Sequence, residues 1–145
     1  MVIRIGRRTL EDIFAHAASA YPEECCGVLI AGSGSKDVVG SVKMRNAFSG
    51  PRHDRYNIDP MELFRAGRDA AGRGLAIAGV YHSHPDHPAT LSTFDIEHSF
   101  PWYSYLVVSV PGGRPGDARS WVAGRDRRSA AEEEIEIRDG EAQTA

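Results

Sequence analysis

The run LAIAGVYHSH, residues 75–84, carries the strongest structural signal in the chain. It is almost continuously apolar and contains β-branched residues, a pattern typical of a strand buried within a sheet. Because side chains alternate along a strand, His82 and His84 share a face where this strand ends. We therefore expect a central strand that presents two imidazoles at one end of the sheet.

Helical and extended patterns alternate around this run. Apolar residues at helical spacing predict a helix over residues 9–21, where Thr9 with Asp12 resembles a capping box. Asp59 followed by Pro60 predicts a second helix ending near Gly72, and a short helix is expected over residues 92–98. Strands are predicted at residues 2–5, 25–32, 37–48 (antiparallel to 25–32), 104–110, 118–123 (an edge strand) and 133–138. The sequence thus predicts an α/β fold with a mixed central β-sheet flanked by helices.

Length and composition limit the function classes. The 145 residues suit one domain, expected over residues 1–138 with a flexible tail at 139–145. A net charge of −3 argues against a nucleic-acid or anionic-membrane surface. The start lacks a secretory signal, no segment is apolar enough to cross a membrane, and the adjacent Cys25 and Cys26 do not suit a disulfide. We expect a cytoplasmic protein, and nothing in the pattern indicates its oligomeric state.

Two interpretations of residues 82–95, HSHPDHPATLSTFD, remain open at this point. Two histidines on one face are good metal ligands, and Asp95 would complete a three-ligand site with an open position. Alternatively, the prolines make a rigid turn, Ser92 and Asp95 form a capping box, and the histidines only make hydrogen bonds.

The full spacing of the segment adds a family resemblance. The pattern H-S-H, seven residues, Ser92, two residues, Asp95 resembles the signature of the JAMM or MPN+ metalloproteases. That family has an upstream glutamate in a P-x-E-x-x-G stretch, and Glu24 matches it in PEECCG, residues 22–27. The resemblance extends from about Thr9 to Val122 and implies a single-domain MPN fold, which is cytidine-deaminase-like.

The resemblance implies a mechanism as well. Zn²⁺ would be held by His82, His84 and Asp95, with Glu24 as general base and Ser92 as hydrogen-bond donor to the developing oxyanion. The stretches YPEECCG, RYNIDP and WYSYLVVS look like the small bacterial branch, whose peptidases are associated with ubiquitin-like sulfur-carrier proteins. The implied reaction is hydrolysis of a peptide or isopeptide bond after the C-terminal Gly-Gly of such a carrier.

Other hypotheses compete with this one. The chain could be a non-catalytic MPN scaffold that binds a protein, or a JAMM-type peptidase acting on unrelated small peptides. A zinc deaminase is disfavoured because its H-x-E and P-C-x-x-C elements are absent.

Among single residues, Glu23 is the rival for the base, and His87 and His98 are expected outside the ligand set. Cys25 and Cys26 are expected to be buried, and the aromatic residues Trp102, Tyr103 and Tyr105 to pack on the sheet. The arginines Arg52, Arg55 and Arg65 are interpreted as solvated, with contact to an acidic partner as the alternative.

Overall fold

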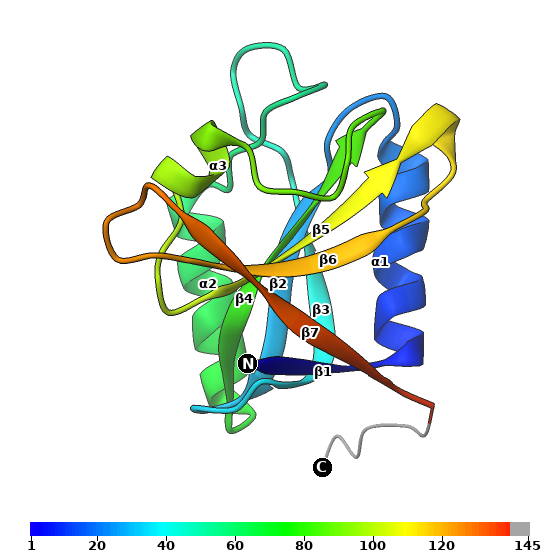
Figure 1. Ribbon diagram of the computed structural model, residues 1–145. Coiled ribbons are helices and arrows are strands. Elements are labelled where there is room, and N and C mark those ends of the chain that lie inside the picture. The colour runs from blue at the N-terminus through cyan, green and yellow to red at the C-terminus, as the bar shows by residue number, and fades with distance from the viewer. Residues whose placement is uncertain (140–145) are drawn as a thin grey trace.

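The computed structural model describes residues 1–139, so the predicted tail falls, except for Asp139, outside the described residues. Figure 1 shows helices arranged around a strongly twisted sheet. None of the helices within residues 1–139 combines the length and hydropathy needed to span a membrane. The elements are β1 (Val2–Gly6), α1 (Arg7–Ala20), β2 (Cys26–Gly32), β3 (Asp37–Met44), α2 (Pro60–Gly72), β4 (Leu75–Pro85), α3 (Thr93–Glu97), β5 (Ser104–Val110), a 3₁₀ turn (Pro111–Gly113), β6 (Ala118–Ala123) and β7 (Ala130–Arg138).

The seven strands form one mixed sheet that closes on itself. Their order is β1-β3-β2-β4-β5-β6-β7, and β1 pairs in parallel with both β3 and β7. The antiparallel pairing of β2 with β3 is confirmed, and β4 lies between β2 and β5 as a central strand. The prediction of an edge strand at residues 118–123 is wrong, because β6 pairs with both β5 and β7. Several β6 side chains remain partly exposed, so the sequence of this internal strand resembles that of an edge strand.

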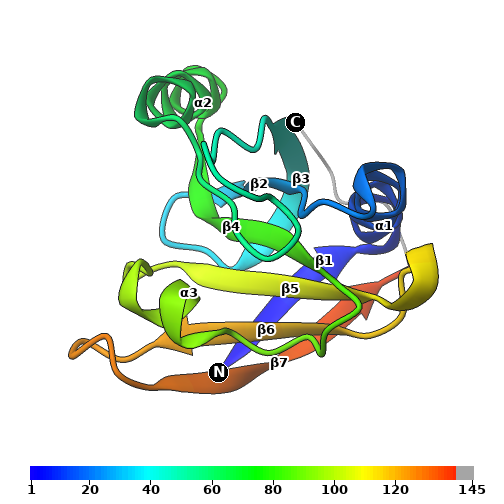
Figure 2. The ribbon, with the colours of Figure 1, turned by 90° about the horizontal axis from the view of Figure 1, so that it is seen from above.

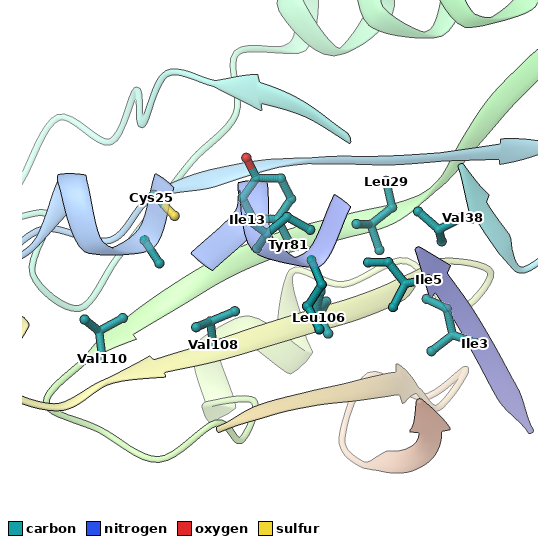
Figure 3. Packing of buried hydrophobic residues seen from close by; sticks show 12 residues of the cluster. Ile3, Ile5, Ile13, Cys25, Leu29, Val38, Tyr81, Leu106, Val108 and Val110 are labelled. Atoms are coloured by element: carbon teal, nitrogen blue, oxygen red, sulfur yellow. The ribbon is translucent and has the colours of Figure 1, made fainter. Parts of the chain in front are cut away.

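Helices cover the central strands on two sides. Leu29 of β2 belongs to a core cluster that includes Ile13 of α1, Tyr81 of β4 and Leu106 of β5 (Figure 3). Its neighbours in β2, Val28 and Ile30, belong to a second cluster, under α2. Figure 2 shows α1 and α2 on different sides of the central strands. Burial on both faces explains why these strands are apolar along their whole length.

The helix starts differ in how well the sequence predicts them. Asp59 is the N-cap of α2, since its Oδ1 accepts a hydrogen bond of 2.7 Å from the Met61 backbone N–H, and Pro60 is the first helical residue. The capping box predicted at Thr9 and Asp12 is wrong: α1 already begins at Arg7, its N-cap is Gly6, and no side chain caps it. The chain passes directly from β1 into α1, so Thr9 lies buried in the first turn.

Three segments far apart in sequence meet at one end of the molecule. The C-terminal end of β4, helix α3 and the loop of residues 45–59 lie together at the top of Figure 1. The loop's backbone contacts the segment between α1 and β2, where the Arg52 carbonyl accepts a hydrogen bond of 2.7 Å from the Glu24 N–H. This end of the fold gathers the polar residues that the sequence analysis identified.

Candidate metal centre and active site

Three ligand-type atoms converge between β4 and α3. The Nε2 atoms of His82 and His84 are 3.1 Å apart, and each lies 3.2 Å from Oδ2 of Asp95. All three side chains are buried. An oxygen of Glu24 also lies close to the two imidazoles, with one ligand atom of each of these residues within 4.8 Å of the others. The four residues form a candidate metal centre.

The spacing of the three atoms fits a small divalent ion. At metal–ligand distances of about 2.0–2.1 Å, neighbouring ligand atoms of a tetrahedral site are separated by about 3.3–3.4 Å. The observed triangle of 3.1–3.2 Å is close to one face of such a tetrahedron. Two imidazoles and one carboxylate also form the kind of ligand set that leaves a fourth position open. The residues therefore fit the metal that the sequence pattern implied.

Neighbouring groups fix the two imidazole rings. His84 Nδ1 is 2.8 Å from the Pro88 carbonyl oxygen. A carbonyl can only accept, so Nδ1 donates this bond, and Nε2 is the nitrogen that faces Asp95. The ring of Tyr56 stacks on His82, with centroids 4.5 Å apart and planes at 23°. Within the described residues, buried His82 Nδ1 has no hydrogen-bond partner, and burial lowers the pKa of His82 despite the opposing charge of Asp95.

Asp95 is oriented by the start of α3. The Ser92 N–H donates to Asp95 Oδ2 over 3.1 Å, and the Asp95 N–H donates to Ser92 Oγ over 3.0 Å, so both halves of a capping box are present. Burial opposes ionisation of Asp95, but the adjacent His82 and the hydrogen bonds from both histidines hold its pKa far below the usual range. Asp95 is therefore ionised at neutral pH. Ser92 Oγ accepts one bond and still has its O–H proton to donate.

Glu24 is a buried acid with one unpaired oxygen. It is 4 % exposed, and its Oε1 has no partner among the described residues. Burial, together with the nearby carboxylates of Asp95 and Asp54, raises the pKa of Glu24 to about 9, while Arg55 acts in the opposite direction. The rival base, Glu23, is half exposed and its Oε2 lies 3.4 Å from Arg52 Nε. Of these two acids, Glu24 is the one beside the histidines.

Two hollows flank the candidate centre. A polar cleft of about 250 Å³ is lined by Glu24, Asp54, Arg55, His84, His87, Pro88, Thr90 and Ser92. A second cavity, of about 340 Å³, lies on the Asp95 side, and aromatic residues such as Tyr56, Phe94 and Tyr105 are among those that line it. A substrate can therefore approach the candidate centre along surfaces of different chemistry.

The remaining predictions about single residues have mixed outcomes. Cys25 and Cys26, where the chain enters β2, are buried and form no disulfide within the described residues, as expected. Tyr105 is buried, but the prediction that Trp102 packs on the sheet is wrong, because Trp102 is 68% exposed, stacks on Phe100 and meets the Tyr103 ring edge-on. His98 Nδ1 lies 2.8 Å from the Phe94 carbonyl oxygen, and among the described residues His98 is not part of the group of ligand atoms around His82 and His84.

Sequence reasoning missed three residues that organise this region. The Asn46 side chain donates to the carbonyls of Glu24 and Arg55 over 3.0 Å each, which ties the loop of residues 45–59 to the segment that carries Glu24. Trp121 donates from its indole to the Ala89 carbonyl over 2.9 Å, and Tyr56 stacks on His82. Their contacts join distant segments, and Asn46 fell inside the strand predicted over residues 37–48, whereas β3 ends at Met44, so none of the three gave a local signal.

Comparison with known proteins adds to this geometry. Residues 6–124 match the family described as prokaryotic homologs of the JAB domain. A desampylase of Haloferax volcanii is 34% identical over 117 residues, which cover 77% of this chain and 82% of the relative. A CysO-cysteine peptidase of Mycobacterium tuberculosis is 30% identical over 121 residues, covering 83% and 82%.

Solved structures share the fold. A protein of Desulfitobacterium hafniense superposes with a TM-score of 0.82 at 30% identity, covering 97% of this chain and 94% of that one. A JAB1/MPN domain protein of Archaeoglobus fulgidus gives a TM-score of 0.57 at 18% identity, covering 94% and 98%. The mixed α/β fold expected from the sequence is that of the JAB1/MPN domain.

Proposed function

The chain belongs to the family of prokaryotic homologs of the JAB domain, and from that premise we propose that it is a zinc metallopeptidase acting on ubiquitin-like sulfur carriers. It would hydrolyse the peptide or isopeptide bond that follows the carrier's C-terminal Gly-Gly. That the chain is a JAMM-type hydrolase follows from its relatives, which include a desampylase and a CysO-cysteine peptidase. The metal, the bond and the carrier are the parts that we propose.

One observation carries the proposal: two imidazole nitrogens and a carboxylate oxygen converge within 3.2 Å of one another beside a buried glutamate. His82, His84 and Asp95 would hold the ion. A bound Zn²⁺ supplies Lewis acidity, which polarises a carbonyl and brings the pKa of water down to about 7. The three ligands alone could hold an ion but could not move a proton, so the acid beside them is what favours hydrolysis.

Glu24 would carry the proton through the reaction. Its free Oε1 would accept a proton from water and return it to the nitrogen of the leaving amine. In the metal-free protein burial raises the pKa of Glu24 to about 9, so this acid needs the positive charge of a bound Zn²⁺ beside it, which would lower that pKa toward neutral and give the ionised form that accepts a proton.

Ser92 would donate its O–H to the oxygen of the attacked carbonyl as negative charge develops there. Loss of one such donor typically lowers kcat by about 100-fold to 1,000-fold.

The substrate is inferred from the relatives and from chemistry. The names desampylase and CysO-cysteine peptidase favour a small protein modifier as the acyl part. A Gly-Gly tail can lie extended in a narrow groove, where backbone hydrogen bonds position the scissile carbonyl. A non-catalytic scaffold would not need the buried Glu24, and a peptidase for unrelated peptides would share the chemistry but not the substrate.

The test compares Glu24→Gln with Glu23→Gln on a ubiquitin-like sulfur carrier extended beyond its Gly-Gly end. Intact-mass spectrometry should show that the wild-type protein and Glu23→Gln release a carrier ending in Gly-Gly, whereas Glu24→Gln does not. Elemental analysis should find about one zinc per chain in all three proteins, and less in Asp95→Ala. Full activity in Glu24→Gln, or no zinc after reconstitution, would contradict the mechanism. Cleavage of unrelated peptides but not of the carrier would reassign the substrate.

A further inference from the structure

If Glu24 returns the proton to the leaving amine, the leaving group must lie in the polar cleft, which Glu24 lines. Among the two hollows described above, only the polar cleft of about 250 Å³ is lined by Glu24 and Ser92. Its volume is below the roughly 300–1,000 Å³ typical of pockets for drug-sized ligands. The cleft therefore suits a single amino-acid residue attached through its amine to the scissile carbonyl.

Arg55 gives this cleft a fixed positive charge. Among the described residues that line it, Arg55 is the one arginine or lysine; the other basic groups are His84 and His87. The guanidinium carbon lies 4.4 Å from the centre of the Phe94 ring, and Nη1 donates to the Asp54 carbonyl over 2.9 Å. These contacts hold the planar group in place and leave other N–H donors free, since a guanidinium has five.

The acidic neighbour of Arg55 does not neutralise it fully. The Asp54 carboxylate lies 3.8 Å from Arg55 Nη1, and the two side chains are 45% and 35% exposed. A partly solvated ion pair of this kind is weak. Arg55 can therefore bind a second carboxylate with its remaining donors.

The backbone keeps Arg55 next to the proposed proton carrier. One nitrogen of the Asn46 amide donates to both the Glu24 and the Arg55 carbonyl oxygens, each at 3.0 Å. The carboxylate carbon of a free amino acid is only two covalent bonds from the amine nitrogen, a distance of about 2.5 Å. A leaving residue whose amine faces Glu24 thus has its own carboxylate within the same small cleft as Arg55.

We propose that Arg55 is a specificity-determining residue that binds the free α-carboxylate of the leaving amino acid. The inference rests on the proposed function and refines it: the enzyme favours removal of a single C-terminal residue after the Gly-Gly sequence. A lysine in an isopeptide bond leaves through its side-chain amine and presents no carboxylate at that distance.

The experiment uses two carriers that differ in one group. Each ends in Gly-Gly-Ala, one with a free C-terminal carboxylate and the other with a carboxamide, and intact-mass spectrometry follows release of the carrier ending in Gly-Gly. Charge-assisted hydrogen bonds of a partly exposed arginine correspond to about a tenfold preference in kcat/KM for the free acid. Arg55→Gln should bring that ratio close to one, and Arg55→Lys should restore part of it.

Arg52→Gln is the matched control, because Arg52 lies in the same loop, faces Glu23 and does not line the cleft. Its acid-to-amide ratio should equal that of the wild-type protein. Taking the ratio within each variant cancels any general loss of folding. Equal cleavage of the two carriers by the wild-type protein, or an unchanged ratio in Arg55→Gln, overturns the inference alone. Cleavage of neither carrier overturns the proposed function together with it.

Discussion

Trp121, which lies outside the sequence motif, is expected to raise both the stability of the protein and the metal affinity of the candidate centre through one hydrogen bond to a nearby loop. Its indole N–H donates to the carbonyl of Ala89, a residue that is 2% exposed and lies in the loop between β4 and α3. The neighbouring residue in that loop, Pro88, provides the carbonyl that accepts a hydrogen bond from His84 Nδ1 and orients its ring. Trp121→Phe keeps an aromatic ring and removes the donor, so it tests this single bond.

The size of the effect can be worked out from the contact. A buried carbonyl left without a partner costs about 1–3 kcal/mol. In a domain of this size, 1 kcal/mol corresponds to about 2–4 °C in melting temperature, so a loss on the order of 5 °C is expected. Removing an outer partner of a ligating histidine typically lowers metal affinity by about 10–100-fold. Trp121 acts one step further away, and we expect the lower end of that range.

Thermal unfolding followed by circular dichroism, and competition for Zn²⁺ with a chromophoric chelator, measure these two effects. Trp102→Phe is the control, because it makes the same chemical change at a residue that is 68% exposed. If Trp121→Phe matches Trp102→Phe in both melting temperature and zinc affinity, the loop does not depend on the indole and the reasoning is refuted.

Two further predictions concern the proton on Glu24 and the packing of the sheet. Burial raises the pKa of Glu24 from 4.5 to about 9, so protonation favours the folded metal-free protein; this contribution is complete below about pH 4.5 and is lost as pH rises through about 9. In calorimetry with a chelator, the wild-type protein should lose melting temperature between these pH values relative to Glu24→Gln, and parallel curves would disprove the assignment. A Cβ on Gly79 would collide with the Ser104 carbonyl, so Gly79→Ala should destabilise by at least about 1–3 kcal/mol in urea, whereas Gly40→Ala, with no atom within 4 Å, should change little.

The parts of the fold that the sequence predicted are those with local causes. Asp59 and Pro60 start α2 because a carboxylate can cap the first N–H groups and proline suits the first turn. The central strand β4 was recognisable because burial on both faces requires apolar residues along its length. Each of these signals lies within about ten residues of the structure that it produces.

No local pattern in the sequence predicted that the sheet closes on itself. Val2 pairs with Glu134, and Gly6 with Arg138, across almost the whole chain. Short alternating strands at the two termini look the same whether they pair with each other or lie at two open edges. For that reason the position of β6 was misjudged, although its boundaries were predicted correctly.

The capping box and the proposed metal site, two interpretations of residues 82–95, are geometrically compatible in one structure. The capping box at the start of α3 is present, and Oδ2 of Asp95, which accepts from the Ser92 N–H, is the same atom that faces both imidazoles. A capping carboxylate is held in one rotamer by the helix end, and this gives a potential metal ligand a fixed direction without further contacts. The spacing of three between Ser92 and Asp95 therefore serves the helix and the proposed centre together. Moving the acid by one position would break both, which gives a physical reason for the fixed spacing of the motif.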